Sequence, residues 1–411
     1  MKDNFLFLGF AIPDLEMEEV FKTDKFPSVQ THKFNWNLIK AMESCNKFKF
    51  TYISARPISD YPNYPKKQIH GKKWTEYLFD KELTFREIPF INSSILKVIT
   101  RFLSGMFYSF VDFHKEKNKK GVIVYSVHIP FMAIGYVMSR LYKIDYITIW
   151  TDPPAVSNSR ESLIKSKLRN FELLISKFLM KKSTKTIALT KHLAEDFAPL
   201  KPYLVIEGII DKSDANTLNR ENNDDIIKIV YTGSLEKRYG IKNIVEGFNL
   251  IEEKNIKLEI YGRGDYEDEL KNMCLKNKNI KYRGFVQADK ILEIQRNATF
   301  LINARCADDD YVKYSFPSKT LEYMLSGSPL ITTMLPGIPK EYKDYFIILE
   351  DNNPETIKQT ILKSTNLDKE ERISIGLKAI KFAKSKSYEK QGEKIIHFLN
   401  EGKGEDKIWH I

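Results

Sequence analysis

The chain has 411 residues, of which 42% are hydrophobic and 29% charged, a globular composition with enough apolar residues for two or three buried cores. Its 65 Lys and Arg residues against 54 Asp and Glu residues leave a net charge of +11, which favours phosphates, acidic lipids or nucleic acid as partners. The three cysteines form no CxxC pair and no zinc-ligand spacing, which argues against a disulfide scaffold or structural zinc and fits a reducing cytosol.

The first residues, MKDNFLFLGFAIPDLEMEE, hold only a short apolar run and then turn acidic, unlike a signal peptide. No uninterrupted run of about 18 apolar residues occurs further along, so we expect no segment to span a membrane.

Short apolar runs separated by helix-length segments recur along the whole chain. Several are apolar throughout, which is typical of strands buried on both faces of a parallel sheet. In the first half, strands are predicted at Asn4–Phe10, Phe48–Ser54, Val122–Val127, Tyr146–Trp150, Thr186–Thr190 and Tyr203–Ile206. In the second half, they are predicted at Ile226–Thr232, Lys257–Tyr261, Ile280–Tyr282, Thr299–Asn303, Leu330–Thr333 and Phe346–Leu349. This alternation predicts an α/β protein with a doubly wound sheet in each half.

The alternation lapses in the polar stretch EGIIDKSDANTLNRENNDD, which indicates a linker. We therefore predict a Rossmann-like domain at 1–210, a linker at 211–225, a second Rossmann-like domain at 226–388, and a final helix and tail at 389–411. Open α/β sheets bind ligands beyond the carboxyl ends of their strands, so we expect a site in the cleft between the domains.

The richest candidate segment follows the strand at Thr299–Asn303 and reads NARCADDDYVKYSFPSKTLEYMLSGSPLITT. A proline and a glycine bracket a short helix here, which places Lys319 in its first turn. A cation there opposes the helix dipole but suits a docked phosphate. Arg305 lies upstream, and Glu322 is three residues beyond Lys319. The alternative is a solvated Lys319–Glu322 ion pair and an ordinary loop cation at Arg305.

Two weaker segments also follow strands. YTGSLEKRYGI turns at Gly233 and carries Lys237 and Arg238, which suit a diphosphate. YGRG brings Gly262 to the end of another strand. The full GxGxxG fingerprint and the Walker A sequence are both missing, which argues against classical nicotinamide and P-loop sites.

Together, IVYTGSLEKRYGIKNIVEGF, LEIYGRGDYEDEL, IKYRGFV and YSFPSKTLEYMLSGSPLITT resemble, in this order, the family 4 glycosyltransferases, most strongly over Ile226–Thr333. The FPSK-x-x-EYM-x-SG form resembles enzymes of bacterial cell-surface polysaccharide assembly. The resemblance implies a GT-B fold, with two Rossmann-like domains facing a cleft and a C-terminal helix that crosses back to the N-terminal domain. It also implies retaining, metal-independent transfer of a hexosyl or related sugar from a UDP- or GDP-linked donor to a glycan or lipid-linked acceptor.

The resemblance also implies roles for single residues. Glu322 matches the second glutamate of the family's Glu-x7-Glu motif, which holds the donor ribose hydroxyls. Tyr314 replaces the first glutamate, which contacts the transferred sugar. The backbone of Ser315 and Phe316 matches the turn that approaches the sugar and phosphate.

The diphosphate contacts are less direct. Ser234 stands where many members carry a phosphate-binding arginine, and Lys237 or Arg238 replaces it, with Lys319 and Arg305 sharing the charge. Ser318 and Thr320, on either side of Lys319, complete the donor-binding set with Gly9, Gly233 and Gly262. We expect catalysis from Lys319, Glu322, Arg238 and His128.

In the first half, Gly9 resembles the family's first-strand loop near the diphosphate. His128, in YSVHIPF, stands where members carry a histidine near the acceptor or donor sugar, or is a satisfied histidine at a strand end. Asp152, in TDPP, faces the cleft or only forms a turn. The run DDD at 308–310 is interpreted as solvated, not as a metal site.

The missing first glutamate leaves two alternatives to a transferase. One is a non-catalytic GT-B subunit that binds a partner enzyme or a nucleotide. The other is a sugar-nucleotide epimerase, which needs no acceptor.

Part of the positive charge lies in Arg160–Lys182, which has seven basic and two acidic residues. Its apolar residues recur at helical spacing and predict an amphipathic helix with its stripe in the core, namely Ile164, Leu168, Phe171, Ile175 and Phe178. The cations face water or anionic lipid. Ile91–Lys120 is rich in aromatic residues that line the acceptor side or the core. We expect a cytoplasmic protein, free or peripheral on the cytoplasmic face of a membrane, with no nucleic-acid partner.

Overall fold

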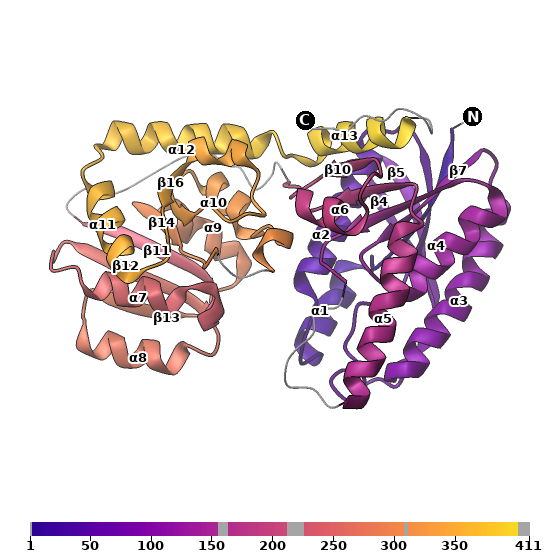
Figure 1. The fold of residues 1–411 in the computed structure, drawn as a ribbon, viewed down its shortest axis with the longest axis horizontal. Coiled ribbons are helices and arrows are strands. Elements are labelled where there is room, and N and C mark those ends of the chain that lie inside the picture. Colours follow the sequence, from indigo (N-terminus) through magenta and orange to yellow (C-terminus); the bar gives the residue numbers. More distant parts are fainter. Residues whose placement is uncertain (1, 155–162, 212–225, 308–310, 402–411) are drawn as a thin grey trace. The chain divides into compact units, whose positions relative to one another are not determined.

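The computed structural model describes residues 2–154, 163–211, 226–307 and 311–401 (Figure 1). The chain divides into two compact units, Met1–Ile209 with Tyr388–Ile411, and Ile210–Ser387. Apart from residue 211, the predicted linker lies outside the described residues, as do the acidic run at 308–310 and the tail beyond 401.

The first unit is built on an eight-stranded sheet in the order β10-β9-β8-β7-β1-β2-β5-β4. Its strands are β1 (Asn4–Gly9), β2 (Lys49–Ser54), β4 (Lys72–Leu78), β5 (Lys81–Glu87), β7 (Lys119–Tyr125), β8 (Asp145–Trp150), β9 (Lys185–Ala188) and β10 (Tyr203–Val205). Neighbouring strands are parallel except β4, which is antiparallel to β5. A separate antiparallel pair is formed by β3 (Gln68–Ile69) and β6 (Phe90–Ile91).

The helices of the first unit are α1 (Asp14–Thr23), α2 (Val29–Ser44), α3 (Ser94–His114), α4 (Ile129–Tyr142), α5 (Leu163–Lys181), α6 (Lys191–Phe197) and α13 (Tyr388–Asn400). The last of these, α13, packs on α2 although the whole second unit separates them in sequence. Lys185 Nζ donates to the carbonyl of Phe398 at 2.9 Å, and Gln391 Nε2 donates to that of Gly208 at 2.9 Å.

The sequence missed the β4–β5 hairpin. Its two-residue turn is Phe79-Asp80, with φ values of 51° and 57°. Such turns favour Asn-Gly or Asp-Gly, so a phenylalanine in the left-handed region gives no recognisable turn signal. The six strands predicted in this half are all present.

The second unit has a six-stranded, wholly parallel sheet in the order β13-β12-β11-β14-β15-β16. The strands are β11 (Ile227–Ser234), β12 (Ile256–Arg263), β13 (Ile280–Gly284), β14 (Phe300–Asn303), β15 (Leu330–Thr333) and β16 (Phe346–Leu349). The helices are α7 (Ile241–Asn249), α8 (Glu267–Lys276), α9 (Ala288–Arg296), α10 (Lys319–Ser326), α11 (Pro354–Thr365) and α12 (Lys369–Lys384), and the 3₁₀ turns are η2 (Lys237–Tyr239), η3 (Val312–Tyr314) and η4 (Lys340–Tyr345). This order, 3-2-1-4-5-6 in chain sequence, is that of a dinucleotide-binding sheet.

Both faces of the second sheet are buried. In β11, Ile229 and Tyr231 pack into one hydrophobic cluster, whereas Val230 packs into another. Successive strand residues point to opposite faces, so a strand covered on both sides is apolar throughout. The predicted α/β architecture with parallel sheets is thus confirmed, and all six strands predicted in this half are present.

One prediction about burial was wrong. Phe171 and Phe178 on α5 are exposed and Ile175 is half-buried, so the described part of its apolar stripe is not enclosed in the core. On α3, Phe107 and Phe110 are exposed and Phe113 is fully buried, so its aromatic residues do not all belong to the core, and their place on the acceptor side stays a prediction. Residues 160–162 of the predicted amphipathic helix, and the side chains of Ile164 and Leu168, lie outside the described structure.

Candidate active site

The order of the second sheet reverses at β11, which pairs with β12 on one side and β14 on the other. Loops after two such neighbouring strands turn to opposite faces of the sheet, and doubly wound domains bind their ligands at this switch point. Gly233 and Ser234 end β11, and Arg305 follows β14 by two residues. The strand order therefore brings candidates from two segments, about 70 residues apart in sequence, to one edge.

Thr232 is the structural centre of this edge. The hydroxyl of Tyr323 accepts a hydrogen bond from Thr232 N at 2.9 Å and donates to Thr232 O at 2.7 Å. Gln295 Nε2 donates to Thr232 Oγ1 at 3.0 Å and to Glu322 Oε1 at 2.6 Å. Because Tyr323 and Gln295 are buried, the end of β11 is fixed relative to α9 and α10.

Lys319, the first residue of α10, points at the same backbone. Its Nζ donates to Thr232 O at 2.8 Å, and no described carboxylate forms an ion pair with it. An ammonium has three donors, so two remain for a ligand. Gly233 leaves the necessary room, since a Cβ there would lie 2.3 Å from Lys319 Nζ. Burial, against the opposing charge of Glu322, lowers the pKa of Lys319 to about 8.

Glu322 is oriented by Gln295 and does not pair with Lys319, so the solvated ion pair considered from the sequence is not formed in the described structure. One carboxylate oxygen accepts from Gln295, and the other has no partner among the described residues. Glu322 thus presents a fixed acceptor one helical turn after Lys319. A vicinal diol is a suitable donor to such a carboxylate.

Arg238 and Arg305 meet on one aromatic ring. The guanidinium carbons lie 4.8 Å and 4.4 Å from the centre of the Tyr239 ring. Cations over an aromatic face are attracted by its quadrupole, so Tyr239 holds two like charges close together. Gly240 permits this approach, because it adopts φ +81° and a Cβ there would lie 1.6 Å from the carbonyl oxygen of Ala304.

The remaining residues of the first loop are held by local partners. Lys237 pairs with Glu269 on α8, and Ser234 Oγ donates to Glu236 at 3.2 Å. Arg238 Nε also donates to Glu236, at 2.6 Å, but its guanidinium shares the Tyr239 ring with Arg305. Of the two basic residues offered in place of the family arginine, Arg238 is the one that lies beside Arg305. Gly262 adopts φ +144° against the backbone of Gly233, where a side chain would clash.

The segment before α10 places its side chains differently. Tyr314 ends η3 with Lys313 over its ring, at 4.8 Å. Phe316 is buried and packs on Tyr342, so only its backbone is available to a ligand. Ser315 is half-buried and Ser318 exposed, whereas Thr320 is buried.

In the first unit the switch point lies between β1 and β7. Gly9 ends β1, and His128 caps α4 just after β7, with its ring 5.0 Å from that of Phe10. His128 Nε2 lies 3.4 Å from an amino group of Arg101. Burial and the charges of Arg101 and Lys97 hold the pKa of His128 well below its usual value, so the imidazole is neutral at pH 7.

Arg101 was not a sequence candidate, because it lies in the apolar helix α3. It is buried, donates to the carbonyl of Arg56 at 2.6 Å, and stacks 4.2 Å from the centre of the Phe90 ring. Lys97, one turn earlier, donates to the carbonyl of Ile58 at 2.6 Å and to Asp60 at 2.8 Å. Asp152 is exposed and accepts from Thr151.

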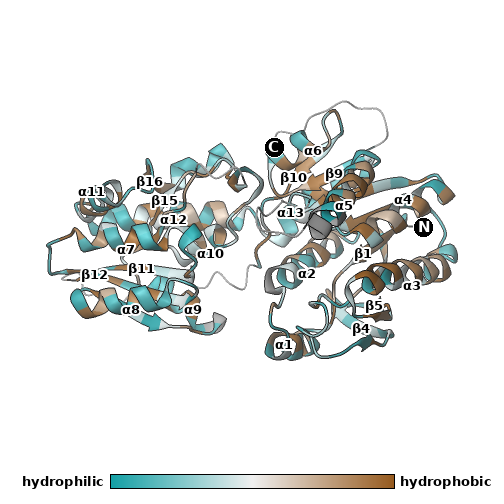
Figure 2. Ribbon diagram, turned by 60° about the horizontal axis from the view of Figure 1, so that its bottom comes forward, coloured by the Kyte–Doolittle hydropathy of each residue, from teal (hydrophilic) through white to brown (hydrophobic). Residues whose placement is uncertain are grey.

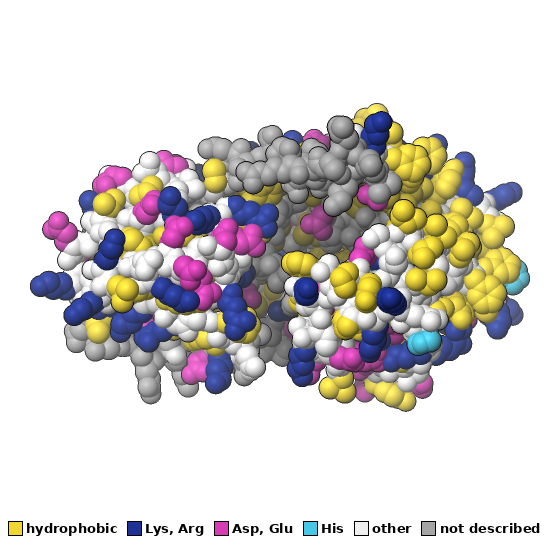
Figure 3. Space-filling view, turned by 90° about the horizontal axis from the view of Figure 1, so that it is seen from below, with side chains coloured by type: hydrophobic (Ala, Val, Ile, Leu, Met, Phe, Trp, Pro, Cys, Tyr) yellow, Lys and Arg dark blue, Asp and Glu magenta, His cyan; other side chains and the backbone are white. Residues whose placement is uncertain are grey.

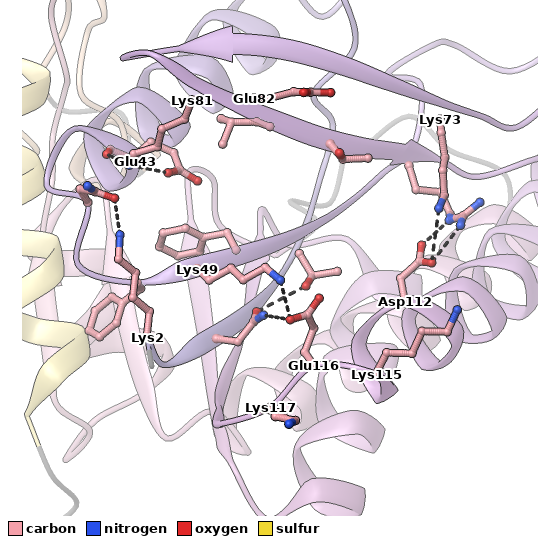
Figure 4. Close-up of a pocket in the computed structure, with 18 residues that line it drawn as sticks. Lys2, Glu43, Lys49, Lys73, Lys81, Glu82, Asp112, Lys115, Glu116 and Lys117 are labelled. Carbon is pink, nitrogen blue, oxygen red and sulfur yellow. Dashed lines mark hydrogen bonds and ion pairs between the residues drawn. The ribbon is translucent and has the colours of Figure 1, made fainter.

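A hollow of about 950 Å³ in the first unit lies at the opposite edge of the sheet, where β1 and β2 begin (Figure 4). Several of its charged side chains pair with one another, as Lys49 with Glu116 at 2.7 Å and Lys81 with Glu43 at 3.4 Å. The hollow lies at the edge of the sheet away from the switch point of this unit, and we assign it no part in the site.

Residues 214–382 match the family model described as Glycosyl transferases group 1. Over 384 residues, the chain is 23% identical to an uncharacterized glycosyltransferase of Methanocaldococcus jannaschii, with 87% of this chain and 88% of the relative covered.

Two solved structures match almost the whole chain. Sucrose-phosphate synthase from Thermosynechococcus elongatus is 11% identical, with a TM-score of 0.66, and 96% of this chain and 98% of that chain are covered. A structure described as trehalose-6-phosphate from E. coli bound with UDP-2-fluoro glucose is 9% identical, with a TM-score of 0.64 and coverage of 97% and 99%. At these identities the likeness shows the fold, which is GT-B, as the sequence predicted.

Proposed function

We propose that the protein is a retaining glycosyltransferase that moves a hexosyl or related sugar from a UDP- or GDP-linked donor to a glycan or lipid-linked acceptor. The match to the group 1 family over 214–382 supports a transferase that uses nucleotide sugars. The observation that carries the proposal is Lys319, a half-buried ammonium at the switch point with two unused donors. Such a cation is costly for the fold and suits a diphosphate.

The other residues at this edge fit the rest of a nucleotide sugar. The carboxylate of Glu322, held by Gln295, would accept hydrogen bonds from the ribose hydroxyls. Arg305 and Arg238 would add positive charge on the diphosphate side. With Tyr314 in place of the first glutamate, we assign the contact with the transferred sugar to the Tyr314 hydroxyl and the backbone of Ser315.

The reaction balances without a covalent enzyme intermediate. The bond between the sugar C1 and the diphosphate oxygen breaks, and the electron pair stays on the diphosphate. The acceptor hydroxyl oxygen forms the new bond to C1 from the same face, and its proton passes to a diphosphate oxygen. Negative charge builds up on the leaving group, where fixed cations lower the barrier most effectively. His128, neutral at pH 7, can accept or donate a hydrogen bond to a sugar hydroxyl.

We further propose that no metal ion is needed, because the cations of Lys319, Arg305 and Arg238 supply the charge that a metal would otherwise bring. We place the reaction in the cytoplasm, where Cys45, Cys274 and Cys306 would remain the free thiols that they are here.

The test starts with a panel of nucleotide sugars screened by thermal shift on the full chain. Transfer from the stabilising donor is then compared between wild type and Lys319→Met. Loss of one charge-stabilising donor costs roughly 10²-fold in rate, and we expect that loss here. Lys340→Met is the control, because Lys340 is an exposed lysine of the same unit. Activity of Lys319→Met within a factor of two of wild type would contradict the phosphate role.

The same assay separates the alternatives. A non-catalytic subunit would bind UDP or GDP but release no nucleotide from any donor, whereas an epimerase would convert a donor with no acceptor present. Either result overturns the transferase proposal.

A further inference from the structure

The outer face of α3, α4 and α5 is apolar and uncovered by any described residue. On α3, Leu103 and Phe107 are 60% and 61% exposed, and on α5, Phe171 and Leu174 are 60% and 67% exposed. Leu141 of α4, which packs between these two helices, is also exposed. Figure 2 shows α3 and α4 largely in brown, and Figure 3 shows hydrophobic side chains gathered over a broad area of this unit. A patch of this kind marks an interaction site.

Positive charge gathers at one end of this face. The helices α4 and α5 each connect parallel strands, and α3 leads into β7, so all three run against the strand direction and end at the same edge of the sheet. The exposed cations there are Lys115, Arg140, Lys143, Lys177, Lys181 and Lys182.

These cations are not neutralised within the described structure. The acidic side chains nearest the end of α3, Asp112 and Glu116, already pair with Arg86 and Lys49. Lys182 Nζ lies 5.2 Å from the ring centre of the exposed Phe178, so charge and apolar surface are directly adjacent. An apolar face bordered by unpaired cations is complementary to an anionic bilayer surface.

Among the described helices, α3 is the one long and apolar enough to cross a membrane. It is nevertheless fixed to the unit by charged side chains on its inner face. Lys97 and Arg101 are buried and bonded to backbone carbonyls of Ile58 and Arg56. A crossing helix would have to give up these bonds and place two cations in hydrocarbon, which is costly. The geometry therefore fits a helix that lies on the bilayer.

We propose that the outer face of α3, α4 and α5 docks on the surface of an anionic lipid bilayer, with apolar side chains among the acyl chains and the cations against the headgroups. The proposal is independent of the transferase activity, since it uses residues of the first unit that the candidate active site does not contain.

The experiment is flotation of the full chain with vesicles of phosphatidylcholine, with and without phosphatidylglycerol, at low and high salt. Wild type is expected to float with the anionic vesicles at low salt and to be released at high salt. In Leu103→Ser/Phe107→Ser, and in Lys177→Glu/Lys181→Glu/Lys182→Glu, the bound fraction should fall at least tenfold.

Matched controls carry the same chemical changes elsewhere. Leu275→Ser alters an exposed leucine of the second unit, 81% accessible. Lys254→Glu/Lys276→Glu/Lys278→Glu reverses three exposed lysines there, so it has the same net charge as the test variant. Both controls should float like wild type, and circular dichroism checks that every variant is folded.

No flotation of wild type, or undiminished flotation of the two face variants, would overturn the proposal. The proposal would also be overturned if wild type bound no vesicles but formed a concentration-dependent dimer by light scattering, and Leu103→Ser/Phe107→Ser abolished that dimer. The face would then be covered by a second copy of the chain. Nucleotide binding by the same variants reports separately on the active site.

Discussion

The buried charge of Lys319 should lower the free energy of unfolding of the second unit. Its pKa falls from 10.5 to about 8 on burial. At about 1.4 kcal/mol per pH unit, holding its proton in the folded state costs about 3 kcal/mol. Methionine has a similar shape and no charge, and it gives up one hydrogen bond worth about 1 kcal/mol. We therefore expect Lys319→Met to raise the free energy of unfolding of the second unit by about 2 kcal/mol at pH 7, while it lowers the rate of transfer roughly 10²-fold.

The extra stability of Lys319→Met should depend on pH. Between about 8 and 10.5 the unfolded state binds more protons at this lysine than the folded state does, so wild-type stability rises with pH in that window. The advantage of Lys319→Met is therefore full below pH 8 and disappears as the pH approaches 10.5.

Urea unfolding followed by circular dichroism at pH 7 and at pH 10 measures this difference. All four tryptophans lie outside Ile210–Ser387, so tryptophan fluorescence reports only the first unit and should not change. Lys340→Met, at an exposed position, should stay within about 0.5 kcal/mol of wild type. Destabilisation of the second unit by Lys319→Met would refute the reasoning and make Lys319 a structural residue.

Four further predictions use the same site. Affinity for UDP or GDP, measured by calorimetry, should fall as the pH rises above about 8, where free Lys319 loses its proton, and a flat profile would argue against a phosphate contact. Glu322→Gln keeps an acceptor for Gln295, so it should weaken nucleotide binding roughly tenfold without a change in stability, whereas unchanged affinity would remove the ribose role. Gly240→Ala should destabilise the second unit by more than about 2 kcal/mol in urea, because the new Cβ would clash with the carbonyl of Ala304. Gly284 has a similar φ, but no atom lies within 4 Å of a Cβ placed there, so Gly284→Ala should cost only about 1 kcal/mol. Transfer should survive EDTA, and loss that Mg²⁺ restores would contradict metal independence.

Much of the fold could be predicted because parallel strands buried on both faces have a recognisable composition. The FLFL run of β1 and the IKIVYT run of β11 are examples, and the residues that directly follow each run, Gly9 and Gly233, fall at the two switch points. The hairpin of β4 and β5 could not be found in this way, since its turn lacks the usual residues and β4 is an edge strand with no buried residue. The sequence also gave no sign that Phe171 would be exposed, because an apolar stripe looks the same whether it meets a core or another partner.

Only some residues of the candidate site could be predicted from the sequence. Lys319 and Arg305 could be found because they directly follow a strand or begin a helix. Gln295, which orients Glu322, lies at the end of α9 within no motif, and nothing in its sequence context predicts that it reaches Thr232. Tyr239 is adjacent to a candidate, but its contact with Arg305 depends on the strand order, not on sequence distance.

The position of α13 has a consequence for biosynthesis. The first unit needs α13, which is translated only after the second unit is complete. The second unit is continuous, and its two ends are joined within it, as Ile210 N donates to the carbonyl of Lys386 at 3.0 Å. On the ribosome, then, the later-encoded unit can fold first, while the earlier one exposes the face of α2 that α13 covers. Chaperone contacts during synthesis should accordingly concentrate on the first unit, and premature termination before Tyr388 should leave the second unit folded and the first one unfinished.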